Sequence, residues 1–193
     1  TSESEKPARM HFDRVLRCVN QDRIRNRRFR VALDSVNGAG SVLSPRFLRD
    51  ELNCELHAIS IDPTKPFPRP AEPTPDVLGD LAALMQETGS DIGFAQDPDG
   101  DRLAVALPDG SLLDNDEVLA LVVDAVLSKM PGDVVVNLTT SSVIDVVAGW
   151  HGRRVFRSAV GEANVVERMI AHRAVIGGEG SNGGIIFPTV HYC

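Results

Sequence analysis

The two halves of the chain repeat one order of elements, and this repetition constrains the fold more than any other feature. Each half alternates apolar strand segments with helical segments and closes with a polar turn between two apolar arms. Strands are expected at residues 29–34, 55–61, 91–96 and 103–107 of the first half, and at 133–138, 153–157 and within 175–187 of the second. This order, β-α-β-α-β-turn-β, predicts an α/β protein with two similar three-layer α/β/α domains, each with a mixed sheet ending in a β-hairpin. We expect the domains at residues 8–109 and 110–193.

Apolar residues at helical spacing separate the strand segments. Helices are expected at about residues 12–19, 41–52, 74–89, 115–129, 141–150 and 162–172. A proline-rich loop, residues 62–75, precedes the third of these helices. Thr74 followed by Pro75 is typical of a helix start, with threonine as the cap and proline in the first turn.

An acidic loop joins the two strands of the first hairpin. Its sequence is Asp97-Pro98-Asp99-Gly100-Asp101-Arg102. Three carboxylates at alternate positions repel one another unless a cation lies between them, and Mg²⁺ prefers such oxygen ligands. The intervening proline and glycine bend the chain so that the carboxylates can converge. We therefore predict a Mg²⁺ site formed by Asp97, Asp99 and Asp101, with Arg102 placed to bind a phosphate carried to the metal.

The acidic loop has other interpretations. An EF-hand is excluded, because its sixth and twelfth positions require glycine and glutamate where this chain has Arg102 and Pro108. A phosphatase loop with Asp97 as the nucleophile remains open from the residues alone. A solvated acidic turn with no ligand also remains open.

A second special turn lies in the second half, at residues 177–184. Its glycines allow close approach of a ligand to the backbone. Glu179, Ser181 and Asn182 offer a carboxylate, a hydroxyl and an amide, which suit sugar hydroxyls. A flexible hairpin tip without a ligand is the alternative. Ligands of such sheets collect where loops leave the strand ends, so both special turns are candidates for one cleft.

Two further glycine turns, residues 37–40 and 160–164, each lie between a strand and a helix. Backbone amides at such a junction could hold an anion. We favour a structural role for both turns, because tight turning and close helix packing explain their glycines.

Composition excludes several classes of protein. A net charge of −7 over 193 residues argues against a nucleic-acid partner. The most apolar stretch, residues 118–127, is too short to span a membrane and is interrupted by Asp124. Three cysteines without metal-ligand spacing are typical of reduced thiols. We therefore expect a soluble, cytoplasmic protein with no membrane partner.

Four motifs together resemble the α-D-phosphohexomutases, which include phosphoglucomutase, phosphomannomutase and phosphoglucosamine mutase. These motifs are residues 34–40, 97–102, 160–162 and 177–181, in the family's order and at suitable separations. In that family four domains surround one cleft, and this chain resembles the second and third. A phosphoserine would come from the first domain and a phosphate-binding loop from the fourth. No serine of this chain stands in the family's Thr-Ala-Ser-His-Asn-Pro context, so the resemblance implies a fragment that is inactive alone.

The resemblance also implies roles for individual residues. Asp97, Asp99 and Asp101 would bind Mg²⁺ together with a phosphoserine oxygen, and Arg102 would lie near the transferring phosphoryl group. Glu179 and Ser181 would hold hydroxyls of a hexose phosphate, while phosphate moves between O1 and O6 through a bisphosphate. Many members end the sugar loop with Ser-Gly-His, whereas this chain has Ser181-Asn182-Gly183-Gly184. Asn182 is therefore an alternative to Ser181 as the sugar contact.

Two other functions remain as alternatives to the mutase. One is a phosphatase with an aspartate nucleophile. The other is a non-catalytic module of two domains that binds a sugar phosphate.

Overall fold

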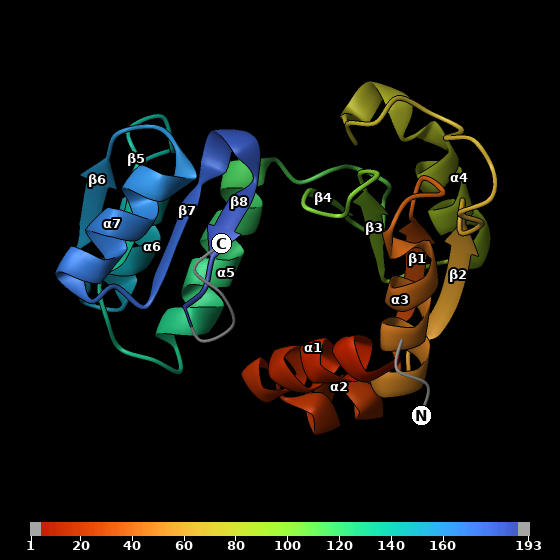
Figure 1. The fold of residues 1–193 in the computed structure, drawn as a ribbon, viewed down its shortest axis with the longest axis horizontal. Helices are drawn as coiled ribbons and strands as arrows, with labels where there is room; N and C mark the ends of the chain where they lie inside the picture. Colours follow the sequence, from red (N-terminus) through yellow and green to blue (C-terminus); the bar gives the residue numbers. More distant parts are fainter. Residues whose placement is uncertain (1–4, 189–193) are drawn as a thin grey trace. The chain divides into compact units, whose positions relative to one another are not determined.

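The computed structural model describes residues 5–188, which form two compact α/β units divided between Leu113 and Asp114. Each unit contains a four-stranded sheet with helices on its faces (Figure 1). The predicted fold class is confirmed. The two units are described separately below.

The sheet of the first unit has the order β2-β1-β3-β4. Its strands are β1 (Arg30–Asp34), β2 (Glu55–Ile59), β3 (Ile92–Gln96) and β4 (Leu103–Ala106). β1 runs parallel to both β2 and β3, whereas β4 pairs antiparallel with β3. The mixed sheet therefore ends in a hairpin, as predicted, and the acidic loop is the tip of that hairpin.

Helices cover both faces of this sheet. On one face α4 (Gly79–Thr88) packs Leu81 and Met85 against Ala32 of the central strand. On the other face α1 (Glu5–Cys18) packs Phe12 against Val31. Neighbouring residues of β1 thus enter two different cores, which explains why the strand is a continuous apolar run. The first unit is completed by α2 (Gln21–Arg27), α3 (Gly40–Arg46), the π-helix η1 (Phe47–Glu51) and the 3₁₀ turn η2 (Pro75–Val77).

Two details of the expected helices are wrong. The single helix expected at 41–52 is an α-helix followed by a π-helical stretch, whose end is closed by the bond from Leu52 N to Phe47 O at 3.1 Å. The expected start at Thr74 is a 3₁₀ turn, and α4 begins only at Gly79. Thr74 is the N-cap residue of this 3₁₀ turn and Pro75 lies in its first turn, but the Thr74 side chain forms no capping bond, because its hydroxyl donates to the Asp76 carboxylate at 2.6 Å. That bond also lowers the pKa of Asp76.

The second unit repeats the topology of the first, with strand order β6-β5-β7-β8. Its elements are α5 (Asn115–Leu127), β5 (Val134–Asn137), α6 (Val143–Trp150), β6 (Val155–Ser158), α7 (Glu162–His172), β7 (Ile176–Glu179), η3 (Gly180–Asn182) and β8 (Gly184–Ile186). Val134 and Val136 of the central strand face the core under α5 and α6, whereas Val135 faces the core under α7. Two consecutive sheets with one topology support the interpretation of an internal repeat.

Within residues 5–188, no helix has both the length and the apolar character needed to cross a membrane.

Candidate functional site

The acidic loop brings its three aspartates together. Asp97 follows β3 directly and is 7% exposed, whereas Asp99 and Asp101 are exposed. One carboxylate oxygen from each residue lies within 4.8 Å of the other two. The alternate spacing seen in the sequence therefore converges on one point in the structure.

Asp97 holds the loop in this conformation. Its Oδ1 accepts hydrogen bonds from the backbone amides of Gly100, at 3.0 Å, and Arg102, at 3.1 Å. Gly100 adopts a φ of +80°, which glycine tolerates better than other residues. Because these bonds use one oxygen of Asp97, its Oδ2 is left for a ligand. No residue in the described range 5–188 donates a hydrogen bond or forms an ion pair to Asp99 or Asp101.

This donor set fits a hard dication. Mg²⁺ binds oxygen at about 2.1 Å, so opposite ligands of an octahedron lie about 4.2 Å apart. The three aspartate oxygens all lie within 4.8 Å of one another, and neighbouring ligands of the same octahedron lie about 3 Å apart. A small inward movement of two exposed side chains would therefore form three corners of such a shell.

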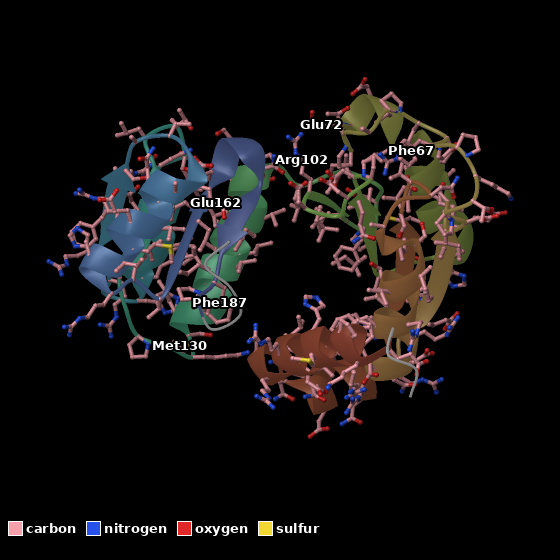
Figure 2. The ribbon with its side chains drawn as sticks, viewed as in Figure 1. Phe67, Glu72, Arg102, Met130, Glu162 and Phe187 are labelled. Atoms are coloured by element: carbon pink, nitrogen blue, oxygen red, sulfur yellow. The ribbon has the colours of Figure 1, made fainter. Side chains whose placement is uncertain are left out.

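Arg102 is the last residue of the acidic loop, but its guanidinium does not pair with the three aspartates. Its Nη1 pairs with Glu72 Oε1 at 2.6 Å, and both side chains are largely exposed. Figure 2 shows these two side chains close together at the edge of the first unit. Glu72 belongs to the proline-rich loop, so this loop reaches the acidic loop.

The sequence analysis missed two residues that the structure brings to the same place. Asp34, at the end of β1, forms a buried ion pair with Arg69 of the proline-rich loop, with 2.6 Å between Asp34 Oδ2 and Arg69 Nε. Their side chains are 4% and 8% exposed. An aspartate ending a buried strand was a signal for such a partner, but nothing in the sequence identifies which arginine supplies it.

The turn at residues 37–40 packs under the acidic loop. The backbone amides of Asn37, Gly38 and Ala39 donate to the carbonyls of Ser60, Ser35 and Pro98, at 2.6, 2.7 and 2.7 Å. A Cβ on Gly38 would lie only 2.4 Å from Pro98 O. Amides already bonded to carbonyls are not free to hold an anion, which supports the structural interpretation of this turn.

A cavity of about 480 Å³ opens in the first unit next to the acidic loop. Asp99 and Gly100 border it, but its walls also include Phe12, Phe47 and Leu103. These apolar side chains offer few hydrogen-bonding groups to a sugar phosphate. The polar side chains that line it outside the acidic loop are those of His11, Ser44 and Gln96.

The predicted sugar loop of the second unit centres on a buried carboxylate. Glu179, at the end of β7, is 7% exposed. Its Oε1 accepts hydrogen bonds from the side-chain amide of Asn137 and the backbone amide of Gly161, both at 2.7 Å. No described residue donates to its Oε2. Gly161 was assigned to a structural turn in the sequence analysis, and the structure shows that this turn holds Glu179.

Asn137 is the residue of this site that the sequence analysis missed. It is fully buried, and its Oδ1 accepts from the backbone amides and hydroxyls of Thr139 and Thr140 at 2.7–3.1 Å. It ends β5 as Asp34 ends β1, so both units use an Asp or Asn side chain at the same point of the repeat. Asn137 donates directly to Glu179 of its loop, whereas Asp34 is connected to the acidic loop through Arg69, which also donates to Gln96 O.

The remaining two predicted sugar contacts lie on η3. Ser181 is exposed, and its hydroxyl lies 3.0 Å from the Thr139 hydroxyl. The backbone of Asn182 is in η3, but its side chain is outside the part of the chain that the structure describes.

Comparison with known proteins accounts for both units. Residues 9–110 match the family model "Phosphoglucomutase/phosphomannomutase, alpha/beta/alpha domain II", and residues 114–193 match the model of domain III. A "Probable phosphoglucosamine mutase" from Methanopyrus kandleri is 37% identical over 193 residues, which cover 99% of this chain and 42% of the relative. A "Phosphoglucomutase/phosphomannomutase" from Thermococcus kodakarensis is 36% identical over 180 residues, covering 92% and 39% respectively.

The fold comparison agrees. A phosphoglucomutase/phosphomannomutase family protein from Burkholderia thailandensis has a solved structure that superposes with a TM-score of 0.79 at 26% identity. The match covers 96% of this chain and 40% of the solved one. The chain thus spans about two fifths of the length of these relatives. It belongs to the phosphoglucomutase/phosphomannomutase family, and its two units match domains II and III of that family.

Proposed function

We propose that this chain supplies the metal-binding and sugar-binding domains of a Mg²⁺-dependent phosphohexomutase. The reaction would move phosphate between O1 and O6 of a hexose phosphate, with glucosamine, mannose or glucose as the sugar. The observation that carries the proposal is the convergence of three aspartate oxygens within 4.8 Å on one loop. Membership of a mutase family makes phosphoryl transfer the reaction that such a loop would serve.

Asp97, Asp99 and Asp101 would hold Mg²⁺, which when bound supplies charge neutralisation for phosphoryl oxygens. Asp97 can serve both loop and metal, because Oδ1 is used by backbone amides and Oδ2 is not. Arg102 would exchange its pair with Glu72 for the phosphoryl oxygens. An exposed ion pair contributes about 1 kcal/mol or less, so a doubly charged phosphate can replace a single carboxylate.

The transferred group would come from a phosphoserine on a further domain of the protein. In the first half-reaction the serine O–P bond would break while a sugar hydroxyl oxygen forms its own O–P bond, and the hydroxyl proton would end on the serine oxygen, which gives free serine and a sugar bisphosphate. After the sugar reorients, the other phosphate returns to the serine. Phosphoryl transfer of this kind depends mainly on positioning and charge, which a dication and an arginine can provide.

The second unit would hold the sugar. Glu179 Oε2 can accept a hydrogen bond from a sugar hydroxyl, since Asn137 and Gly161 hold only Oε1. Ser181 can exchange its bond with Thr139 for a second hydroxyl. Asn182 completes the proposed set. A small set of polar contacts suits a substrate that must bind in two orientations, because each contact can be formed by different hydroxyls.

The test is mutase activity of the full-length protein with a hexose 1-phosphate, followed by ³¹P NMR as the 6-phosphate forms. Asp99→Asn is expected to lower kcat by about 10²–10³-fold, as for loss of one group that stabilises transition-state charge. Asp109→Asn is the matched control, because Asp109 lies at the other end of β4 and its Oδ1 accepts from the amide and hydroxyl of Ser111 within its own turn. Equal activity of Asp99→Asn and the control would contradict the proposal.

Of the two alternatives, the aspartate-nucleophile phosphatase has less support. Family membership favours transfer between two positions of a sugar over hydrolysis. The same NMR assay distinguishes the two reactions, because a phosphatase releases inorganic phosphate. A binding module would produce neither product.

A further inference from the structure

We propose that Arg69 is a positioning residue for the acidic loop, an inference that rests on the proposed function of that loop. Arg69 lies in residues 62–75, here called the proline strap. Its Nε donates to Asp34 Oδ2 and its Nη2 to Gln96 O, both at 2.6 Å. One guanidinium therefore joins the strap, the end of β1 and the end of β3.

The bond to Gln96 O acts directly on the first aspartate. Gln96 is the last residue of β3, so its carbonyl belongs to the same peptide group as the amide of Asp97. The Asp97 amide in turn lies 3.4 Å from Arg102 O, which it approaches as a donor. The carbonyl of this planar peptide group is thus bonded by Arg69, and its amide is bonded within the acidic loop. Its orientation decides where the Asp97 side chain leaves the chain.

Arginine suits this position because its planar guanidinium presents several N–H donors in fixed directions. The third nitrogen, Nη1, donates to the carbonyls of Pro70 at 3.1 Å and Ala71 at 3.4 Å. Prolines of the strap have carbonyls but no amide to donate, so the strap depends on donors from side chains. A lysine could keep the ion pair with Asp34, but its single ammonium cannot reach all these acceptors in the fixed geometry of a guanidinium.

The strap also carries the partner of Arg102. Glu72 stands three residues after Arg69 and pairs with Arg102 at 2.6 Å. Fixing the carbonyls of Pro70 and Ala71 therefore fixes the segment that presents Glu72. Arg69 acts on both ends of the acidic loop, through Gln96 at the start and through Glu72 at Arg102.

If the Asp34–Arg69 ion pair were merely structural, it would stabilise the first unit without affecting its metal affinity. The test therefore measures metal affinity and stability separately. Mn²⁺ serves as the probe, and free Mn²⁺ is followed by electron paramagnetic resonance during titration of this chain. Folding of each variant is followed by urea unfolding. The variants are Arg69→Lys, which keeps a cation beside Asp34, and the double variant Asp34→Asn with Arg69→Met, which leaves no unpaired buried charge.

The stability control is Leu81→Val, a change in the core under α4 on the opposite face of the sheet from α1. It should lower the urea midpoint and leave Mn²⁺ affinity unchanged. Both Arg69 variants should remain folded and bind Mn²⁺ about tenfold more weakly, the lower end of the loss typical of residues that orient metal ligands. Wild-type affinity in either folded Arg69 variant would overturn the inference.

Failure of the proposed function gives a different result. In that case the unaltered chain binds Mn²⁺ no better than Asp99→Asn does, and both proposals are overturned. If the unaltered chain binds Mn²⁺, Asp99→Asn does not, and the Arg69 variants bind normally, only the positioning role is wrong.

Discussion

Substitution of Gly38 by alanine should disturb the acidic loop from beneath. The added Cβ would lie 2.4 Å from Pro98 O and 2.7 Å from Pro98 Cα, whereas ordinary contacts begin near 3.4 Å. Both atoms are backbone, so the loop must move by about 1 Å, a shift comparable with overpacking that costs about 1–3 kcal/mol. The movement also breaks the 2.7 Å bond from the Ala39 amide to Pro98 O, which adds about 1 kcal/mol. We expect a total loss of about 2–4 kcal/mol from the stability of the first unit.

Amide hydrogen exchange measured by mass spectrometry can assign this loss to the correct unit. Peptides from β1 and β3 should exchange faster in Gly38→Ala, while peptides from β5 and β7 should not change. Gly79→Ala is the matched control, because a Cβ there meets no atom within 4 Å, and it should be neutral or stabilising by up to about 1 kcal/mol. Equal protection of β1 and β3 in the two variants would refute the packing argument.

Three further predictions concern buried or paired groups. Asn137→Asp would place a carboxylate where the amide now donates to Glu179 at 2.7 Å. The second unit should lose about 3 kcal/mol of stability at pH 7, because two buried carboxylates would then face each other without a donor between them, and an unchanged urea midpoint would contradict this. The backbone amide of Arg30 donates to Asp91 and lowers the pKa of that carboxyl. The ionised Asp91 carboxylate therefore contributes its full stabilisation above about pH 4 and loses it as the pH falls through the lowered pKa. The difference in unfolding free energy between wild type and Asp91→Asn, measured with urea, should shrink only below about pH 4. Burial raises the pKa of the Cys54 thiol. At pH 8 this thiol should react with a thiol-specific disulfide reagent much more slowly in the native protein than in urea. Equal rates in the two conditions would contradict the burial of Cys54.

The strands and most helices could be predicted because their apolar spacing decides both their type and their partners. The valine run at the start of β5 is buried on both faces, and α7 has the bounds expected from its periodicity, Glu162–His172. The π-helix at Phe47–Glu51 could not be predicted, because five residues, about one turn, are too few to show a change in the spacing of apolar residues. Thr74 is the N-cap residue of a 3₁₀ turn instead of an α-helix, and its side chain forms no capping bond because its hydroxyl bonds to the Asp76 carboxylate.

The convergence of the three aspartates was predictable because it depends on residues adjacent in the chain. The supports of the two loops were not, because they depend on contacts between distant residues. Arg69 and Asp34 are 35 positions apart, and Asn137 and Glu179 are 42 apart. One sequence gives no means of pairing such residues, although each stands at the end of a strand or in a loop beside one.

The central claim is that the three aspartates of the acidic loop bind Mg²⁺. The most direct measurement is a Mg²⁺ titration of the ¹⁵N-labelled chain, followed by amide chemical shifts in the chain itself and in Asp99→Asn. The account predicts saturable shifts concentrated at residues 97–102 that are lost in Asp99→Asn and kept in Asp109→Asn. Shifts that are absent at residues 97–102, or that persist in Asp99→Asn, would contradict it.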